Sequence, residues 1–190
     1  LPAIAAHFGT PFHLYDETGI LRTGQQLKQA FAQVDGFREF YAVKALPNPA
    51  ILALMHQLGF GFDCSSIAEL RLARAAGAGP DDIMFTSNNT APDEFAAALD
   101  EGGCILNLDD INLIDKVPHF PERICFRYNP GAERSGNVII GKPEEAKYGV
   151  ARHQLVDAFA RAKARGARHF GLHCMLASNE RDAGYVIETV

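Results

Sequence analysis

The feature that most constrains the fold is a repeated alternation of short apolar runs and amphipathic stretches. The apolar runs occupy residues 39–45, 61–64, 83–86, 104–108, 124–129 and 170–175. The stretches at 49–58, 66–76, 92–101 and 150–165 are rich in Ala and Leu, and several open with Pro or a Ser or Asp cap and close with Gly. Strands that alternate with helices in this way predict a parallel sheet, because a parallel pair needs a crossover connection.

Polar side chains follow the predicted strands at their carboxyl ends. They include Lys44, Asp63, Arg127 and Ser178. Six strand-helix units fit either a doubly wound sheet or most of a (βα)8 barrel, and both architectures place their ligands at this end. The glycines at 59 and 61 do not form the G-x-G-x-x-G pattern of a dinucleotide site. The periodicity therefore predicts an α/β fold and leaves the choice of architecture open.

Composition narrows the class of protein. The 190 residues are 47% hydrophobic and carry a net charge of -5, which is enough apolar material for one core and argues against a nucleic-acid surface. No apolar stretch is long enough to span a membrane. The four cysteines lie far apart without a C-x-x-C, so we expect reduced core thiols, no metal site and a cytoplasmic protein.

Lys44 ends the apolar run F-Y-A-V-K-A-L-P-N-P. Burying an ammonium is costly, and desolvation lowers the lysine pKa and frees the amine to attack an aldehyde. Lys44 is thus a candidate for Schiff-base formation, although this segment alone also fits a surface lysine with a buried stem. The helix-poor segment 129–150 is longer than an ordinary connection and is either functional or a surface excursion.

The run around Lys44 resembles the Y-A-V-K-A-N signature of the alanine-racemase-like (fold-type III) decarboxylases, which depend on pyridoxal phosphate (PLP). Five more segments are similar to family motifs and occur in the family's order. They are G-F-G-F-D-C-S-S-I-A-E at 59–69, I-M-F-T-S-N at 83–88, R-Y-N-P-G at 127–131, A-K-Y-G-V at 146–150 and G-L-H-C-M-L-A-S at 171–178. The segments at 127–131 and 146–150 resemble the diaminopimelate decarboxylase branch in particular.

The resemblance implies a TIM-type (βα)8 barrel, present as an N-terminal part of about six βα units. Residues 1–35 are then expected to supply an N-terminal strand and helix, and residues 36–190 a partial PLP-binding barrel. A C-terminal β-domain is expected outside this sequence. Since six strands cannot close the barrel, we expect an enzyme of about twice this length, inactive as this part alone.

The resemblance also implies a function and a site. The favoured reaction is decarboxylation of meso-diaminopimelate to L-lysine through a PLP aldimine with Lys44, in a homodimeric enzyme that binds an amino-acid substrate. Asp63 and Glu69 are expected around the cofactor, Arg127 near its phenolic oxygen, and Ser178 at its phosphate. The expected cofactor-binding residues are Lys44, Asp63, Glu69, Arg127, Met175 and Ser178.

Three positions depart from the family pattern. Leu46 replaces an Asn, Ala177 replaces a Gly beside the phosphate, and Met175 replaces the His that stacks on the pyridine ring. A thioether can lie against an aromatic ring but cannot supply a proton there. His173 shares the strand face of Met175, and we expect it to line the strand without reaching the ring.

Other functions remain compatible with the sequence. The substrate of a related PLP decarboxylase would be ornithine, arginine or carboxynorspermidine. A Schiff-base aldolase without a cofactor also uses a barrel lysine, and a visible absorbance band bleached by borohydride distinguishes the two. The departures at Leu46 and Met175 also fit a catalytically inactive homologue that acts as a binding protein.

Overall fold

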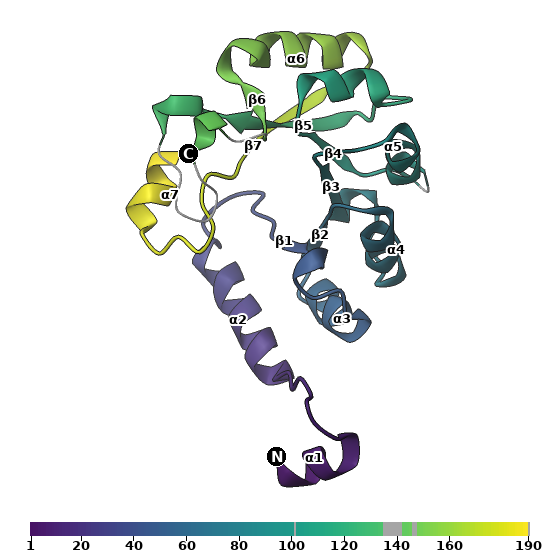
Figure 1. Cartoon of the computed structure of the whole chain (residues 1–190), viewed down its shortest axis with the longest axis vertical. Helices are drawn as coiled ribbons and strands as arrows, with labels where there is room; N and C mark the ends of the chain where they lie inside the picture. Colours follow the sequence, from purple (N-terminus) through teal and green to yellow (C-terminus); the bar gives the residue numbers. More distant parts are fainter. Residues whose placement is uncertain (101, 135–141, 146–147, 190) are drawn as a thin grey trace.

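The chain folds around one curved parallel sheet (Figure 1). The computed structural model describes residues 1–100, 102–134, 142–145 and 148–189. All strand pairs in the described part are parallel, in the order β1-β2-β3-β4-β5-β6, with β7 also paired to β5. The strands are β1 (Phe40–Ala42), β2 (Gly61–Cys64), β3 (Ile83–Ser87), β4 (Ile105–Leu108), β5 (Arg123–Asn129), β6 (Val150–Ala151) and β7 (His169–Cys174).

The two partners of β5 lie on opposite edges of that strand. β4 pairs with residues 124–126, and the two-residue β6 continues along the same edge at 128 and 129. β7 pairs with residues 123–128 on the other edge. β7 is therefore the sixth full strand of the curved sheet, and β6 is a short extension beside β5.

Helices cover the outer face of the sheet, as Figure 1 shows. They are α3 (Pro49–Gln57), α4 (Ile67–Ala75), α5 (Pro92–Leu99) and α6 (Arg152–Ala164), and a 3-10 segment, η3 (Ile111–Lys116), connects β4 to β5. Local sequence explains where they begin: Asn48 accepts hydrogen bonds from the first turn of α3, and Ser66 caps α4.

Alternate strand residues face the helices and form the core. Phe62, Phe85, Leu106 and Phe126 are each fully buried there. Burying one such side chain contributes about 1.5–3 kcal/mol, so this layer dominates the stability of the sheet. The intervening residues point to the inner, concave face, and this alternation brings polar groups of several strands to one side.

The six predicted strands are confirmed, with ends within a few residues, and so is the parallel fold of a TIM-type barrel's first part. The helix-poor character of the segment after Asn129 also holds for its described residues, which form the 3-10 turns η4 (Gly131–Glu133) and η5 (Pro143–Glu145). Positions 135–141 and 146–147, which include part of the A-K-Y-G-V motif, lie outside the described residues.

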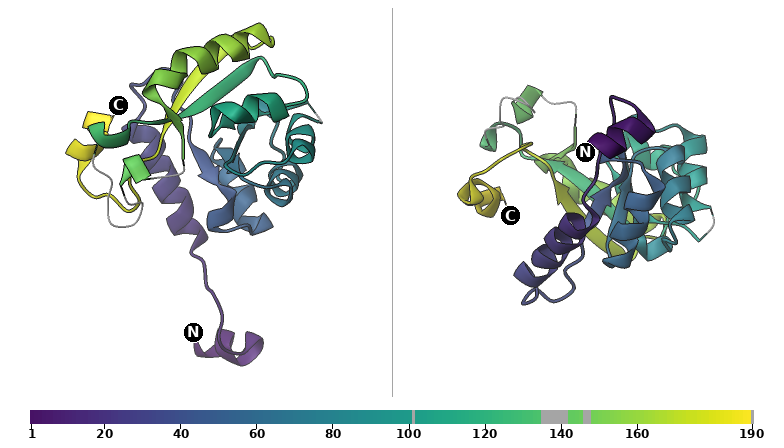
Figure 2. Two further views of the ribbon diagram at one scale, coloured as in Figure 1. Left: turned by 45° about the horizontal axis from the view of Figure 1, so that its top comes forward. Right: turned by 90° about the horizontal axis from the view of Figure 1, so that it is seen from below.

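The prediction of a strand within residues 1–35 is wrong for the described chain, whose first strand is β1. Residues 12–15 are irregular, because no described strand lies beside them to complete a ladder. Instead, α1 (Pro2–Phe8) precedes α2 (Glu17–Ala30), and α1 projects from the sheet on an extended segment (Figures 1 and 2). The C-terminal α7 (Ala183–Thr189) follows β7. No helix of the described part is long and apolar enough to cross a membrane.

Candidate functional site

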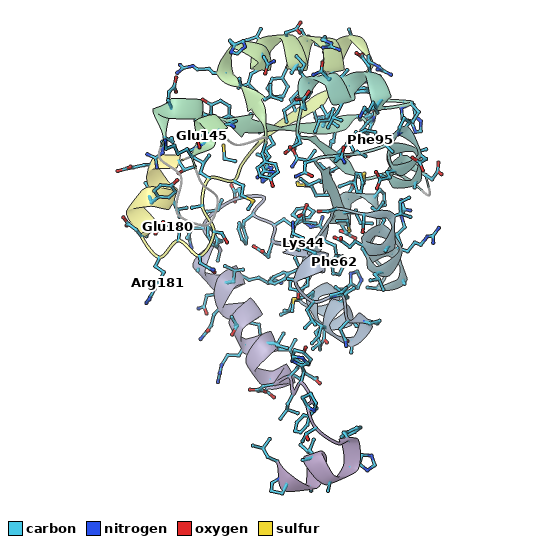
Figure 3. All side chains as sticks on the ribbon, viewed as in Figure 1. Lys44, Phe62, Phe95, Glu145, Glu180 and Arg181 are labelled. Atoms are coloured by element: carbon cyan, nitrogen blue, oxygen red, sulfur yellow. The ribbon has the colours of Figure 1, made fainter. Side chains whose placement is uncertain are left out.

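Lys44 lies just beyond β1, in the 3-10 turn η1 (Val43–Ala45). Val43 points into the core and is fully buried, whereas Lys44 is exposed. Figure 3 shows Lys44 at the inner side of the sheet and Phe95 between the sheet and the helices. The burial that the sequence argument assumed for the Lys44 ammonium is therefore wrong for this chain, while its strand-end position is confirmed.

Asp63 of β2 lies on the inner face, where several charged residues affect its pKa. Its carboxylate accepts a hydrogen bond of 2.7 Å from Thr86 Oγ1. Burial raises the pKa of Asp63, and the Thr86 hydrogen bond and the charge of Lys44 oppose this rise. Weaker effects come from Glu69, which raises the pKa, and Arg127, which lowers it. The structure thus brings Lys44, Glu69 and Arg127 within electrostatic range of Asp63.

Glu69 has a structural role that the sequence reading missed. Its carboxylate accepts hydrogen bonds from Ser65 N and Ser66 Oγ, and Ser66 Oγ in turn accepts from Glu69 N. This reciprocal arrangement at the start of α4 is a variant of the capping box in which the backbone donor is Ser65, the residue before the N-cap Ser66. The S-x-x-E spacing of residues 66–69 is the sequence signal that could have revealed it.

Arg127 of β5 is held by two partners. Its guanidinium forms a buried ion pair of 3.1 Å with Asp109 and lies 4.5 Å from the centroid of the Tyr148 ring. Burial raises the pKa of Asp109, and the charge of Arg127 opposes that rise. Asp109 follows β4 at its carboxyl end, so the rule that selected Lys44 and Asp63 could also have selected it. Together these contacts fix the orientation of Arg127.

A further row of polar side chains crosses the inner face. Asn107 Nδ2 lies 3.2 Å from Thr86 Oγ1 and 2.9 Å from His173 Nδ1. Burial, with a smaller effect of Arg127, lowers the pKa of His173 to about 4. His173 therefore lines the strand, as expected. Asn107 was missed, although a single Asn in the apolar run I-L-N-L was a signal.

Met175 and Ser178 follow β7. Met175 is 43% exposed and lines a small hollow with Arg127 and Tyr148. Met175 therefore lies outside the hydrophobic core of the described chain. Ser178 is half-buried in the loop three residues further on. Leu46 packs against the core, and Ala177 is half-buried.

The cysteines and the acidic residues suggest no other chemistry. The four thiols are free, and burial raises the pKa of Cys104 to about 12. In the described part of the chain no three His, Cys, Asp or Glu side chains are grouped to hold a metal ion.

The fold and the inner-face group together define a class of protein. A lysine amine, a carboxylate and a fixed guanidinium lie at the carboxyl ends of parallel βα strands, where barrel enzymes place their sites. An accessible amine can bind an aldehyde, and a guanidinium can bind an anionic oxygen, so these residues fit PLP.

Comparison with known families agrees with this class. Residues 18–189 match the family described as "Pyridoxal-dependent decarboxylase, pyridoxal binding domain", and the chain belongs to this family. PLP is the cofactor of this domain.

Two curated relatives illustrate the similarity. Protein TabA of Pseudomonas amygdali pv. tabaci is 43% identical over 91% of this chain, and diaminopimelate decarboxylase of Thermoplasma acidophilum is 34% identical over 94%. This chain covers 41% and 44% of their respective lengths. It therefore spans less than half of the relatives it matches.

Solved structures show the same fold. Diaminopimelate decarboxylase from M. jannaschii, in complex with L-lysine, superposes on 98% of this chain with a TM-score of 0.86 and 25% identity, and 46% of that protein is covered. The enzyme from Helicobacter pylori, also with L-lysine, gives 0.81 at 25% identity, with 98% of this chain and 49% of that protein covered.

Proposed function

We propose that the protein carrying this chain is a PLP-dependent carboxy-lyase that converts meso-diaminopimelate to L-lysine. The observation that carries the proposal is the inner-face group, in which Lys44 follows β1, Asp63 accepts a hydrogen bond from Thr86, and Arg127 is held by Asp109. The similarity to proteins named diaminopimelate decarboxylase supports the choice of substrate. A homodimer in the cytoplasm, with no nucleic-acid or membrane partner, is part of the same proposal.

The residues of this chain divide the work. Bound PLP supplies an electron sink for the electrons released when a bond at the substrate α-carbon breaks. Lys44 provides the amine that holds the cofactor, and its charge opposes the rise that burial causes in the pKa of Asp63. Arg127, oriented by Asp109 and Tyr148, offers a fixed positive charge to an anionic oxygen of the cofactor.

Three further residues complete the proposed site. Glu69 adds negative charge near Asp63 while it accepts hydrogen bonds from Ser65 and Ser66 at the start of α4. Met175 offers a thioether to the cofactor ring from the hollow beside Arg127. Ser178, in the loop after β7, is proposed to donate a hydrogen bond from its hydroxyl to a phosphate oxygen of the cofactor.

The first experiment tests the lysine. Lys44→Ala in the protein carrying this chain should abolish the visible absorbance band of bound PLP and the covalent label left by borohydride reduction. Lys163→Ala is the matched control, because Lys163 is exposed on α6, on the outer side of the sheet. A band that persists in Lys44→Ala and still bleaches with borohydride would show that another lysine holds the cofactor.

The second experiment tests the substrate. Release of carbon dioxide is measured with meso-diaminopimelate, ornithine, arginine and carboxynorspermidine. The proposal expects the highest kcat/KM with meso-diaminopimelate. Preference for another member of the panel would retain the class of enzyme and replace the substrate, and no release with any of them would favour a binding protein.

A further inference from the structure

The polar row on the inner face connects β2 to β7 without interruption. Thr86 Oγ1 donates to Asp63, and Asn107 Nδ2 contacts both Thr86 Oγ1 and His173 Nδ1. Asn107 is 1% exposed, and its carbonyl oxygen is buried with no hydrogen-bond partner among the described residues. Asn107 therefore joins its two neighbours through its amide nitrogen.

Asn107 and His173 lie on the two strands that flank β5. Asn107 is in register with Cys125, and Cys125 is in register with Gly171 of β7. A Cβ atom on Gly171 would overlap Cys125 Sγ. The Asn107 amide on one side of β5 contacts His173 on the other side.

The chemistry of the groups fixes the direction of each hydrogen bond. An ionised Asp63 only accepts, so the single proton of the Thr86 hydroxyl is directed to it. The Thr86 oxygen must then accept from the Asn107 amide, whose second N–H faces His173. An Nδ1 that accepts carries no proton, so His173 is neutral and protonated at Nε2.

We infer that Asn107 is a positioning residue that couples the protonation of His173 to the hydrogen bonding of Asp63. A proton on Nδ1 of His173 requires the opposite orientation of the Asn107 amide, with its oxygen toward His173 and Thr86. The Thr86 hydroxyl then donates to Asn107 and leaves Asp63. The inference rests on the proposed function only where it gives Asp63 a place in the cofactor site.

The surroundings of His173 agree with an uncharged imidazole. Burial and Arg127 of β5 lower its pKa to about 4. Burial raises the pKa of the neighbouring thiols Cys125 and Cys174, which are therefore uncharged at neutral pH. The hydrogen bonds that connect Asp63 to His173 run through Thr86 and Asn107.

The test reads the imidazole directly, by ring 15N NMR of the protein carrying this chain between about pH 3 and pH 8. His173→Gln identifies the signal. The wild-type protein should show the Nε2–H tautomer and a titration well below the ordinary histidine pKa of about 6.5. A wild-type Nδ1–H tautomer would overturn the inference, even if the variants below fail to fold.

Thr86→Val separates the row from simple electrostatics. Threonine is uncharged, so a charge effect predicts no change at His173. Loss of the hydroxyl frees the Asn107 amide to turn, and the proton affinity of His173 should rise by about tenfold. Thr86→Ser should restore the wild-type titration, and Thr90→Val, which removes a buried hydroxyl outside the row, should leave it unchanged. Equal titrations in Thr86→Val and wild type would refute the coupling.

Failure of this test leaves the cofactor assignment untouched. Loss of PLP binding in Lys44→Ala is measured by absorbance and does not depend on the tautomer of His173. The proposed function and the coupling therefore fail independently.

Discussion

Removal of Asp109 is expected to destabilise the fold strongly. The side chains of Arg127 and Asp109 are only 9% and 2% exposed, and their charged atoms lie 3.1 Å apart. Asp109→Ala leaves the Arg127 guanidinium buried without its counter-ion. Breaking a buried pair in this way costs about 3–5 kcal/mol, whereas the loss of an exposed pair costs about 0–1 kcal/mol.

The matched control is Asp115→Ala. Asp115 pairs with Arg161 at 3.0 Å, but its side chain is 73% exposed. Urea unfolding at pH 7 gives the free energy of unfolding of each variant, provided that the slope with denaturant stays constant. We expect the Asp109 variant to lose several times more stability than the Asp115 variant.

The double variant Asp109→Leu with Arg127→Met tests the physical reason. If the cost of Asp109→Ala comes from an uncompensated buried charge, removing both charges should restore most of the stability. Equal losses in Asp109→Ala and Asp115→Ala, or a double variant less stable than Asp109→Ala, would refute the reasoning.

Three further predictions concern the inner face. Burial raises the pKa of Asp63 in the folded state, so protonated Asp63 stabilises the fold fully below its ordinary pKa of 3.8, and this stabilisation is lost as pH rises through the folded-state pKa. The thermal midpoint of Asp63→Asn should therefore rise relative to that of the wild type as pH rises. A difference in thermal midpoint that stays constant with pH contradicts this prediction. Glu69→Gln can keep hydrogen bonds to Ser65 and Ser66, so the free energy of unfolding should change by less than about 0.5 kcal/mol while PLP retention weakens. Unchanged PLP retention would leave Glu69 only its structural role at the start of α4. Met175→His should lower the free energy of unfolding by less than about 1 kcal/mol, since the position is 43% exposed. The same variant should make PLP retention depend on pH near about 6.5. A large loss of stability with PLP retention that does not depend on pH contradicts the proposed position of Met175.

Local sequence predicted the elements because their causes are local. The run at residues 61–64 became β2 with the expected bounds, since Phe62 and Cys64 face the core and the polar Asp63 between them faces the inner side. Asn48 and Pro49 fixed the start of α3 through hydrogen bonding and a preset φ angle. Selecting polar residues at the carboxyl ends of the predicted strands identified Lys44, Asp63 and Arg127, because the carboxyl ends of parallel strands lie at one edge of the sheet.

Residues 12–15 show where local pattern fails. Their apolar and aromatic side chains suit a strand, but a strand also needs a neighbour to receive its hydrogen bonds, and the described chain provides none. The exposure of Lys44 has a similar origin, because burial depends on which distant segments cover a residue.

The sequence by itself determined the parallel βα architecture and the side chains that reach its ligand-binding end. Only the tertiary structure decided their partners. The Arg127–Asp109 pair joins β5 to the residue after β4, and the contact of Asn107 with His173 joins β4 to β7 across β5. Such contacts join residues far apart in the chain, and their geometry arises from strand register and sheet curvature, which no local pattern encodes.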